Sequence, residues 1–145
     1  MSIPNWTIDV SNKTSTLDIY VDNVLVTIYS FNNNIFNLSA LNTVNVELVE
    51  LNRNINIIFE WISLINKYLN TNLSIKKNFD NSIKRKDNSV KGKLTIDNIL
   101  SSDINFQQED SYVTFKSRSN LSLDTYDFIL WINFINTFYK ICKNF

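Results

Sequence analysis

Apolar and polar residues alternate along much of the first 40 residues, a period of two that is typical of β-strands with one buried face. The alternation runs over residues 15–21 and resumes over 24–30, after an Asp-Asn pair at 22–23. Three asparagines at 32–34 end the second stretch, and a short apolar stretch follows at 35–38. We therefore predict a β-hairpin and a third strand. Asparagine can form the turns because it tolerates positive φ better than most residues with a side chain.

Residues 43–70 carry two overlapping patterns. Apolar residues recur every three or four positions over 48–69, which fits one long amphipathic helix. Residues 43–51 also alternate and are rich in valine, which favours a strand. In the second half of the chain a strand-like stretch precedes a helix. By analogy, we predict a strand over 43–51 and a helix over 53–70, with Asn52 as the N-cap.

A short motif of the first half recurs in the second. Residues 61–69 read WISLINKYL and residues 131–139 read WINFINTFY, so that Trp, two Ile and Asn recur at the same spacing. This predicts an α+β fold of two strand-rich halves, each ending in an amphipathic helix, with antiparallel sheets packed on the two helices. We place the halves at 1–70 and 73–145 of a single domain, joined by a basic segment over 71–93. An internal duplication would explain the repeat.

The second half contains shorter strand-like stretches. Apolar residues favour strands over 73–79 and 93–99, and a hairpin with strands over 104–107 and 112–117. The last helix is the clearest prediction. Asp124 can cap its N-terminus, and apolar residues then continue through several turns.

This last helix carries more apolar surface than one sheet would cover. One broad face includes Phe128 and Trp131, and a second apolar face lies beside it. A helix that packs only on its own sheet needs one apolar stripe. We expect the second face either to be buried in the core or to contact a protein partner or a second copy of the chain. The candidate interface residues are Leu130, Phe134, Ile141 and Phe145.

Composition indicates the kind of genome that encodes the chain. The 145 residues include 24 Asn but one Gly, one Pro and no His. Residues with A/T-rich codons are favoured over residues with G/C-rich codons. This pattern indicates an A/T-rich genome, such as that of a low-GC bacterium, a phage or other mobile element, or an organelle. Motifs that contain Asn therefore carry little weight.

The residues needed for most catalytic and metal sites are scarce. Without His, a Ser–His–Asp triad is impossible and the commonest metal ligand is missing. The single Gly excludes glycine-rich nucleotide loops, and Cys142 on the apolar face of the last helix is expected to be a core residue. A carboxylate-only nuclease is the remaining catalytic option, but no Asp-X-Lys or Glu-X-Lys triplet occurs. We expect no enzyme, no metal site and no cofactor.

Basic residues cluster in the middle of the chain. Seven of the 14 Lys and Arg residues lie within 76–93, where only Asp80 and Asp87 oppose them. Such a cluster can bind phosphate groups, and an aromatic ring in it can stack on a base. A solvated linker of the same composition is the other explanation. The candidate nucleic-acid-binding residues are Lys76, Lys77, Phe79, Lys84, Arg85, Lys86, Lys91 and Lys93.

Overall charge and hydropathy limit the possible cellular location and partners of the chain. Lys plus Arg and Asp plus Glu number 14 each, so no global field attracts the chain to nucleic acid or to a membrane. No apolar run is long enough for a transmembrane helix, and the first ten residues lack the pattern of a secretory signal. We expect an intracellular protein, in the cytoplasm of its own cell or of a host, without membrane attachment.

The function expected from these observations is a non-enzymatic interaction with another macromolecule, in the first place a protein. The A/T-rich composition favours an accessory or inhibitor-type protein of a phage or mobile element. Two alternatives stay open. One is a single-stranded nucleic-acid-binding protein that uses residues 76–93, and the other is a structural subunit of a larger assembly.

Overall fold

A computed structural model describes residues 1–40, 43–74, 83–86, 89–95, 103–109, 112–116 and 120–143. These residues form strands and two helices, which confirms the predicted α+β class. The elements are β1 (Ser2–Asp9), β2 (Thr14–Val21), β3 (Val24–Asn32), β4 (Ile35–Ala40), β5 (Thr43–Glu47), α1 (Leu48–Leu69), β6 (Ile83–Lys86), β7 (Ser89–Thr95), β8 (Asp103–Glu109), β9 (Tyr112–Lys116), β10 (Asn120–Asp124) and α2 (Thr125–Lys143).

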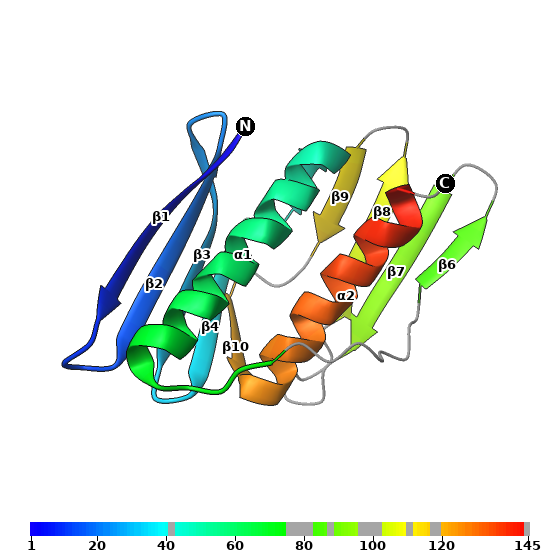
Figure 1. Cartoon of the computed structure of the whole chain (residues 1–145). Coiled ribbons are helices and arrows are strands. Elements are labelled where there is room, and N and C mark those ends of the chain that lie inside the picture. Colours follow the sequence, from blue (N-terminus) through cyan, green and yellow to red (C-terminus); the bar gives the residue numbers. More distant parts are fainter. Residues whose placement is uncertain are drawn as a thin grey trace.

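The strands form two antiparallel sheets of five strands each. Sheet A has the order β1-β2-β3-β4-β10, and sheet B has the order β5-β9-β8-β7-β6. The two helices pack against each other and lie on one side of both sheets (Figure 1). Each helix contacts strands of both sheets, because α1 touches β1, β2, β5 and β9, whereas α2 touches β4, β7 and β10. The buried apolar residues form one connected core.

Each half of the chain contributes one strand to the sheet of the other half. β5 comes from the first half but pairs with β9, and β10 comes from the second half but pairs with β4. Ser39 pairs with Asn120 in sheet A. Thr43, four residues after Ser39, pairs with Lys116, four residues before Asn120, in sheet B. The β4–β10 and β5–β9 pairings therefore share one antiparallel register, and each pairs a strand of one half with a strand of the other.

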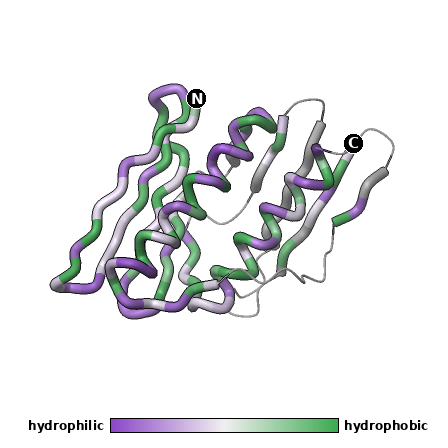
Figure 2. The backbone as a smooth tube through the Cα atoms, in the orientation of Figure 1, coloured by the Kyte–Doolittle hydropathy of each residue, from purple (hydrophilic) through white to green (hydrophobic). Residues whose placement is uncertain are grey.

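The predicted hairpin of the first half is confirmed. β2 and β3 are paired antiparallel, and Asp22 and Asn23 between them have φ angles of 50° and 68°. Asn33 and Asn34 form the next turn with φ angles of 52° and 63°. Asparagine thus takes the positions that glycine often has in such turns. Figure 2 shows the alternation of apolar and polar residues along these strands.

The sequence patterns did not predict the first strand. β1 pairs with β2 over residues 2–9 at the edge of sheet A. Its residues alternate in burial, with Ser2 buried, Pro4, Trp6 and Ile8 half-buried, and the residues between them exposed. Pro4 is compatible with this position because an edge strand does not need every backbone N–H for the sheet.

The predicted start of the first helix is wrong. α1 begins at Leu48 rather than near residue 53, and Glu47 at the end of β5 is the N-cap residue. Asn52 therefore lies inside the helix and does not cap it. Glu50 and Leu51 in the first turn are buried, with exposed fractions of 7% and 6%. Packing of this turn on the core outweighs the strand preference of the neighbouring valines.

Part of the segment that was predicted to connect the halves belongs to sheet B. β6 and β7 are paired strands at the edge of this sheet. The hairpin predicted with strands over 104–107 and 112–117 is confirmed as β8 and β9. Of the strand predicted over 93–99, residues 93–95 belong to β7 and 96–99 lie outside the described residues. The strand predicted over 73–79 is not present at residues 73–74, and its remainder lies outside the described residues.

The repeated Trp motif does not occupy equivalent positions in the two helices. Trp61 is the 14th residue of α1, whereas Trp131 is the seventh residue of α2. The difference of seven residues is about two helical turns. Counted from the start of each helix, the two Trp side chains therefore point in similar directions, but Trp61 lies about two turns further along its helix. Trp61 Nε1 donates to Ser15 Oγ at 2.7 Å, and Trp131 Nε1 donates to the Tyr29 hydroxyl at 3.4 Å. Both indoles face sheet A, and an internal duplication stays a prediction.

Candidate interaction surface

The second apolar face of α2 is covered by the chain itself. Phe134 is fully buried, and its ring lies against Gly92 of β7. The prediction that Phe134 belongs to an exposed partner interface is therefore wrong, because a second sheet forms beneath that side of the helix. Of the other candidate interface residues, Leu130 and Ile141 are half-buried, and Phe145 lies outside the described residues.

The single glycine of the chain lies where α2 meets sheet B. A Cβ atom at Gly92 would lie 2.9 Å from Phe134 Cζ and 3.0 Å from Phe138 Cδ2. It would also lie 3.1 Å from Ile83 Cγ1. Non-bonded carbon atoms prefer separations of about 3.5–4.0 Å. The glycine therefore allows a close approach of helix and sheet that any larger residue would oppose.

The side of sheet A that faces away from the helices is open in the described part of the chain. We call it the outer face of sheet A. Its central row crosses all five strands through directly paired residues, each of which is exposed or half-buried. These residues are uncharged and can all form hydrogen bonds. They are Thr7, Thr16, Ser30, Asn37 and Ser122.

A shallow depression of about 360 Å³ lies on this face over β3, β4 and β10. Ile28 contributes apolar surface to it, and polar side chains such as Ser30, Asn37 and Asn120 surround it. The depression is an open feature of the sheet surface and not an enclosed cavity. It is suited to receive a side chain of a larger molecule.

The two sheets differ in charge. The strands of sheet A contain three acidic residues, Asp9, Asp18 and Asp124, and no Lys or Arg, which gives a formal charge of −3. The strands of sheet B contain six basic and three acidic residues, which gives a formal charge of +3. These residues are Lys84, Arg85, Lys86, Lys91, Lys93 and Lys116, against Glu47, Asp103 and Glu109.

Two of the candidate nucleic-acid-binding residues are exposed neighbours on sheet B. Lys84 in β6 pairs directly with Lys91 in β7, and both side chains are exposed. Lysines on an edge strand also discourage pairing with another chain, so the pair has a structural explanation as well. The backbones of Arg85, Lys86 and Lys93 belong to the same strands, and Lys76, Lys77 and Phe79 lie outside the described residues.

The outer faces of the two sheets lie on the same side of the molecule. Ser39 in β4 and Asn45 in β5 are exposed, whereas Leu38 and Val46 are buried. Side chains alternate along a strand, and this alternation has the same phase in β4 and β5. The helices cover the opposite side of both sheets. The two outer faces therefore form adjacent parts of one surface.

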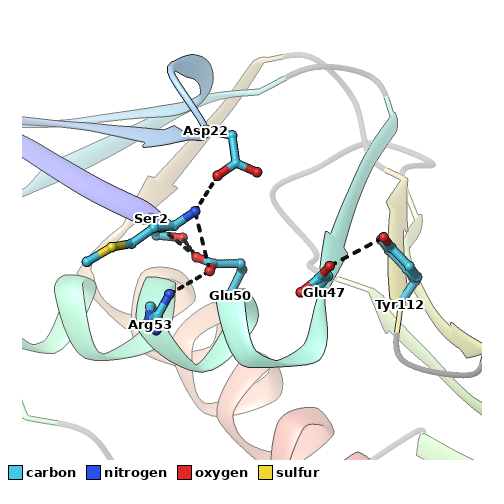
Figure 3. Close-up of polar contacts among 7 residues, drawn as sticks. Ser2, Asp22, Glu47, Glu50, Arg53 and Tyr112 are labelled. Carbon is cyan, nitrogen blue, oxygen red and sulfur yellow. Dashed lines mark hydrogen bonds and ion pairs between the residues drawn. The ribbon is translucent and has the colours of Figure 1, made fainter.

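A buried carboxylate connects the edge of sheet A to the start of α1 (Figure 3). Glu50 Oε2 accepts hydrogen bonds from the Ser2 backbone and from Ser2 Oγ, the latter at 2.7 Å. Glu50 Oε1 accepts a hydrogen bond from Arg53 Nη1 at 2.7 Å and lies 3.5 Å from the Met1 amino group. Burial alone would raise the pKa of Glu50. The hydrogen bonds from Ser2 and the two nearby positive charges outweigh burial, so the pKa lies below its usual value.

One small cavity lies where the two helices meet both sheets. Its volume is about 50 Å³, and its lining includes Ile19, Val113 and Trp131. Asn54 also lines this cavity, and its Oδ1 is buried without a hydrogen-bond partner among the described residues. A cavity of this size holds a few water molecules at most, and a water there would satisfy Asn54. The cavity therefore has a structural explanation.

Among the described residues, no group of three or more His, Cys, Asp or Glu side chains could hold a metal ion. Cys142 is buried, and burial raises the pKa of its thiol to about 12. The thiolate is the reactive form of cysteine, so this residue is inert at neutral pH. The helices of the described chain are too short or too polar to cross a membrane.

No protein-family model matches the sequence, and comparison with curated proteins and with solved structures finds no significant match.

Proposed function

We propose that the chain is a non-catalytic protein-binding module that uses the outer face of sheet A. The observation that carries this proposal is the uncharged central row, in which five adjacent strands present Ser, Thr and Asn side chains to solvent. Burying a charge without a partner costs far more free energy than burying a hydroxyl or amide that gains a new hydrogen bond. Charged residues are accordingly depleted at the centres of protein interfaces. The row is suited to burial beneath a partner.

The depression beside the row supports the same function. It lies on the sheet surface next to Asn37 and Ser122, and Ile28 gives it an apolar wall. A side chain of the partner that enters it would bury apolar surface while the surrounding polar groups form hydrogen bonds. An apolar anchor within a polar rim is the usual arrangement of a binding hot spot.

The wider biological role remains part of the proposal. An accessory or inhibitor-type protein acts by occupying a surface of another protein, which requires a binding face and no catalytic residues. The A/T-rich composition favours a phage or mobile element as the source, and an intracellular location is part of the same proposal.

Site-specific photo-crosslinking in the native host tests this function. A photo-reactive amino acid would replace Asn37 at the centre of the outer face, and a control would carry it at Glu60, an exposed position of α1. We expect a discrete covalent adduct from position 37 and none from position 60. Equal adducts from both positions, or no adduct from position 37, would show that the outer face of sheet A is not the binding surface.

Nucleic-acid binding is a second candidate function, because Lys84 and Lys91 are exposed neighbours. A fluorescent single-stranded oligonucleotide would be titrated at about 50 and 200 mM salt. This function requires binding at the lower salt concentration that weakens steeply at the higher one, because each phosphate contact releases counterions. Lys84→Gln with Lys91→Gln should then weaken binding, whereas Lys67→Gln on α1 should not. Absence of binding at the lower salt concentration excludes this function.

A further inference from the structure

We propose that the protein bound by this open surface is a second copy of the same chain. The outer face of sheet A in one copy stacks on the outer face of sheet B in the other. This inference rests on the proposed function and names its partner. Three observations support it: the opposite charges of the two sheets, their placement on one side of the molecule, and the size of the surface.

Charge complementarity identifies the second copy as the occupant. Among the described side chains of the two outer faces, sheet A has the acidic Asp9 and Asp18 and no basic residue, whereas sheet B has the exposed neighbours Lys84 and Lys91 against Glu47. Each copy therefore presents both halves of a matched pair. The whole chain has a formal net charge of zero, so no overall repulsion opposes the approach of two copies. Complementary potentials favour this pairing and disfavour stacking of like sheets.

The placement of the sheets allows both contacts to form at once. The outer faces of the two sheets both lie on the side that faces away from the helices. A two-fold axis between the copies, roughly parallel to the strands, places sheet A of each copy over sheet B of the other. The resulting interface is self-complementary and closed, so that assembly ends at the dimer.

The size of the surface is sufficient for a stable dimer. Strands are about 4.8 Å apart and rise about 3.3 Å per residue. Five strands of four to nine residues, about six on average, therefore present roughly 400–600 Å² on one face. The two sheets together offer about 800–1,200 Å² per copy, and a standard interface needs about 800 Å² per partner. The small side chains of the central row would allow the sheets to approach to about 10 Å, the usual distance of stacked sheets.

Two charge-altered variants test the pairing. The first carries Asp18→Lys, Asn37→Lys and Ser122→Lys, which makes the outer face of sheet A positive. The second carries Lys84→Glu and Lys91→Glu, which makes sheet B negative. All five positions are exposed or half-buried in the monomer, so we expect both variants to fold. Far-UV circular dichroism would verify this before the mass of each species is measured.

The native chain should be a dimer by light scattering at about 50 mM salt and should dissociate as salt screens the charges. Each variant alone should be monomeric, because like charges face each other in its homodimer. An equimolar mixture should form a 1:1 heterodimer, because both of its contacts are again complementary. Native mass spectrometry distinguishes this heterodimer from either homodimer by mass. The control Glu60→Lys changes charge on α1, away from both faces, and should dimerise like the native chain.

Other outcomes overturn the inference. A native chain that stays monomeric at low salt, or variants that dimerise alone, would exclude stacking of sheet A on sheet B. If the native chain is monomeric but position 37 still crosslinks to another protein in the host, the inference fails and the proposed function survives. If the chain is monomeric and only an oligonucleotide binds to it, both fail. If the native chain dimerises but the mixture of the two variants stays monomeric, the charges of the two sheets do not hold the copies together, and the inference is overturned.

Discussion

Sheets A and B share one strand plan, yet the helices pack on them in different ways. In each sheet four consecutive strands form a meander and the fifth strand comes from the other half. Beneath sheet A, the rings of Phe36 and Phe128 stack with centroids 3.8 Å apart, and Trp61 meets both rings edge-on at 5.7 and 6.2 Å. Beneath sheet B, Phe134 lies directly on the backbone of Gly92. The same strand order is thus combined with a cluster of three aromatic rings beneath sheet A and with a close helix-to-strand contact beneath sheet B.

The outer faces extend this difference to charge. Sheet A presents an uncharged central row and only acidic charges, whereas sheet B presents the exposed neighbours Lys84 and Lys91. Since the outer side chains of a one-sided sheet hardly affect the core, each face is free to acquire its own character. The core and the outer face of each sheet can therefore be altered separately.

The aromatic cluster beneath sheet A should be the most sensitive part of the fold. Trp61→Ala removes a side chain with an exposed fraction of 0% and leaves Ser15 Oγ without its donor. We expect the free energy of unfolding to fall by about 3–5 kcal/mol, measured by urea denaturation. Trp61→Phe is the matched control and should lose less, because it keeps much of the packing. Equal losses from both changes would mean that ring volume does not determine the stability of this cluster.

At the contact between α2 and β7, a smaller side chain at position 134 should destabilise the fold less than a larger side chain at position 92. Gly92→Ala places a methyl group within 2.9 Å of Phe134 and should cost about 1–3 kcal/mol of unfolding free energy. Phe134→Leu in the same chain should recover part of this loss, because a smaller side chain makes room for the methyl group. A double-mutant cycle measures the coupling. A coupling near zero would show that the two residues do not compete for space.

The Glu50 carboxylate, which accepts hydrogen bonds from Ser2 at the edge of sheet A, should make the free energy of unfolding depend on pH. Glu50→Gln should cost about 1–3 kcal/mol at pH 7, because a charged acceptor of several hydrogen bonds is lost. The folded pKa of Glu50 is lowered, so its contribution is complete above the unfolded pKa of about 4.3 and is lost as pH falls through the folded pKa. The difference between native chain and variant should therefore shrink in acid. Unfolding curves at pH 7 and at acid pH provide the measurement, and a constant difference would contradict the ionised state of Glu50.

Changes on the outer faces should have the smallest effect on folding. Lys91→Gln on sheet B and Thr16→Ser on sheet A should each alter the free energy of unfolding by less than about 0.5 kcal/mol. Both side chains lie away from the helices, and only the first change alters the charge that the proposed dimer needs. Thermal unfolding of the two variants measures stability, and light scattering measures association. A large loss of stability from either variant would contradict the separation of core and outer face.

Much of the fold could be predicted from local patterns. The turn at Asp22 and Asn23 depends on residues that are adjacent in sequence, and so does the cap of α2, where Asp124 Oδ1 accepts a hydrogen bond from the Asp127 backbone at 2.8 Å. The start of α1 could not be predicted in this way. Its first turn is held by Glu50 and Ser2, which are 48 positions apart in the chain.

Composition and residues a few positions apart were enough to predict the α+β class, the asparagine turns, the last helix and the scarcity of catalytic side chains. Three features became known only from the folded chain: the exchange of β5 and β10 between the halves, the membership of β6 and β7 in a sheet, and the burial of Phe134. These features depend on contacts between distant segments, and a side chain that looks free for a partner becomes core once another segment packs on it. For the same physical reason, the outer faces became visible as a surface only after the strands were paired.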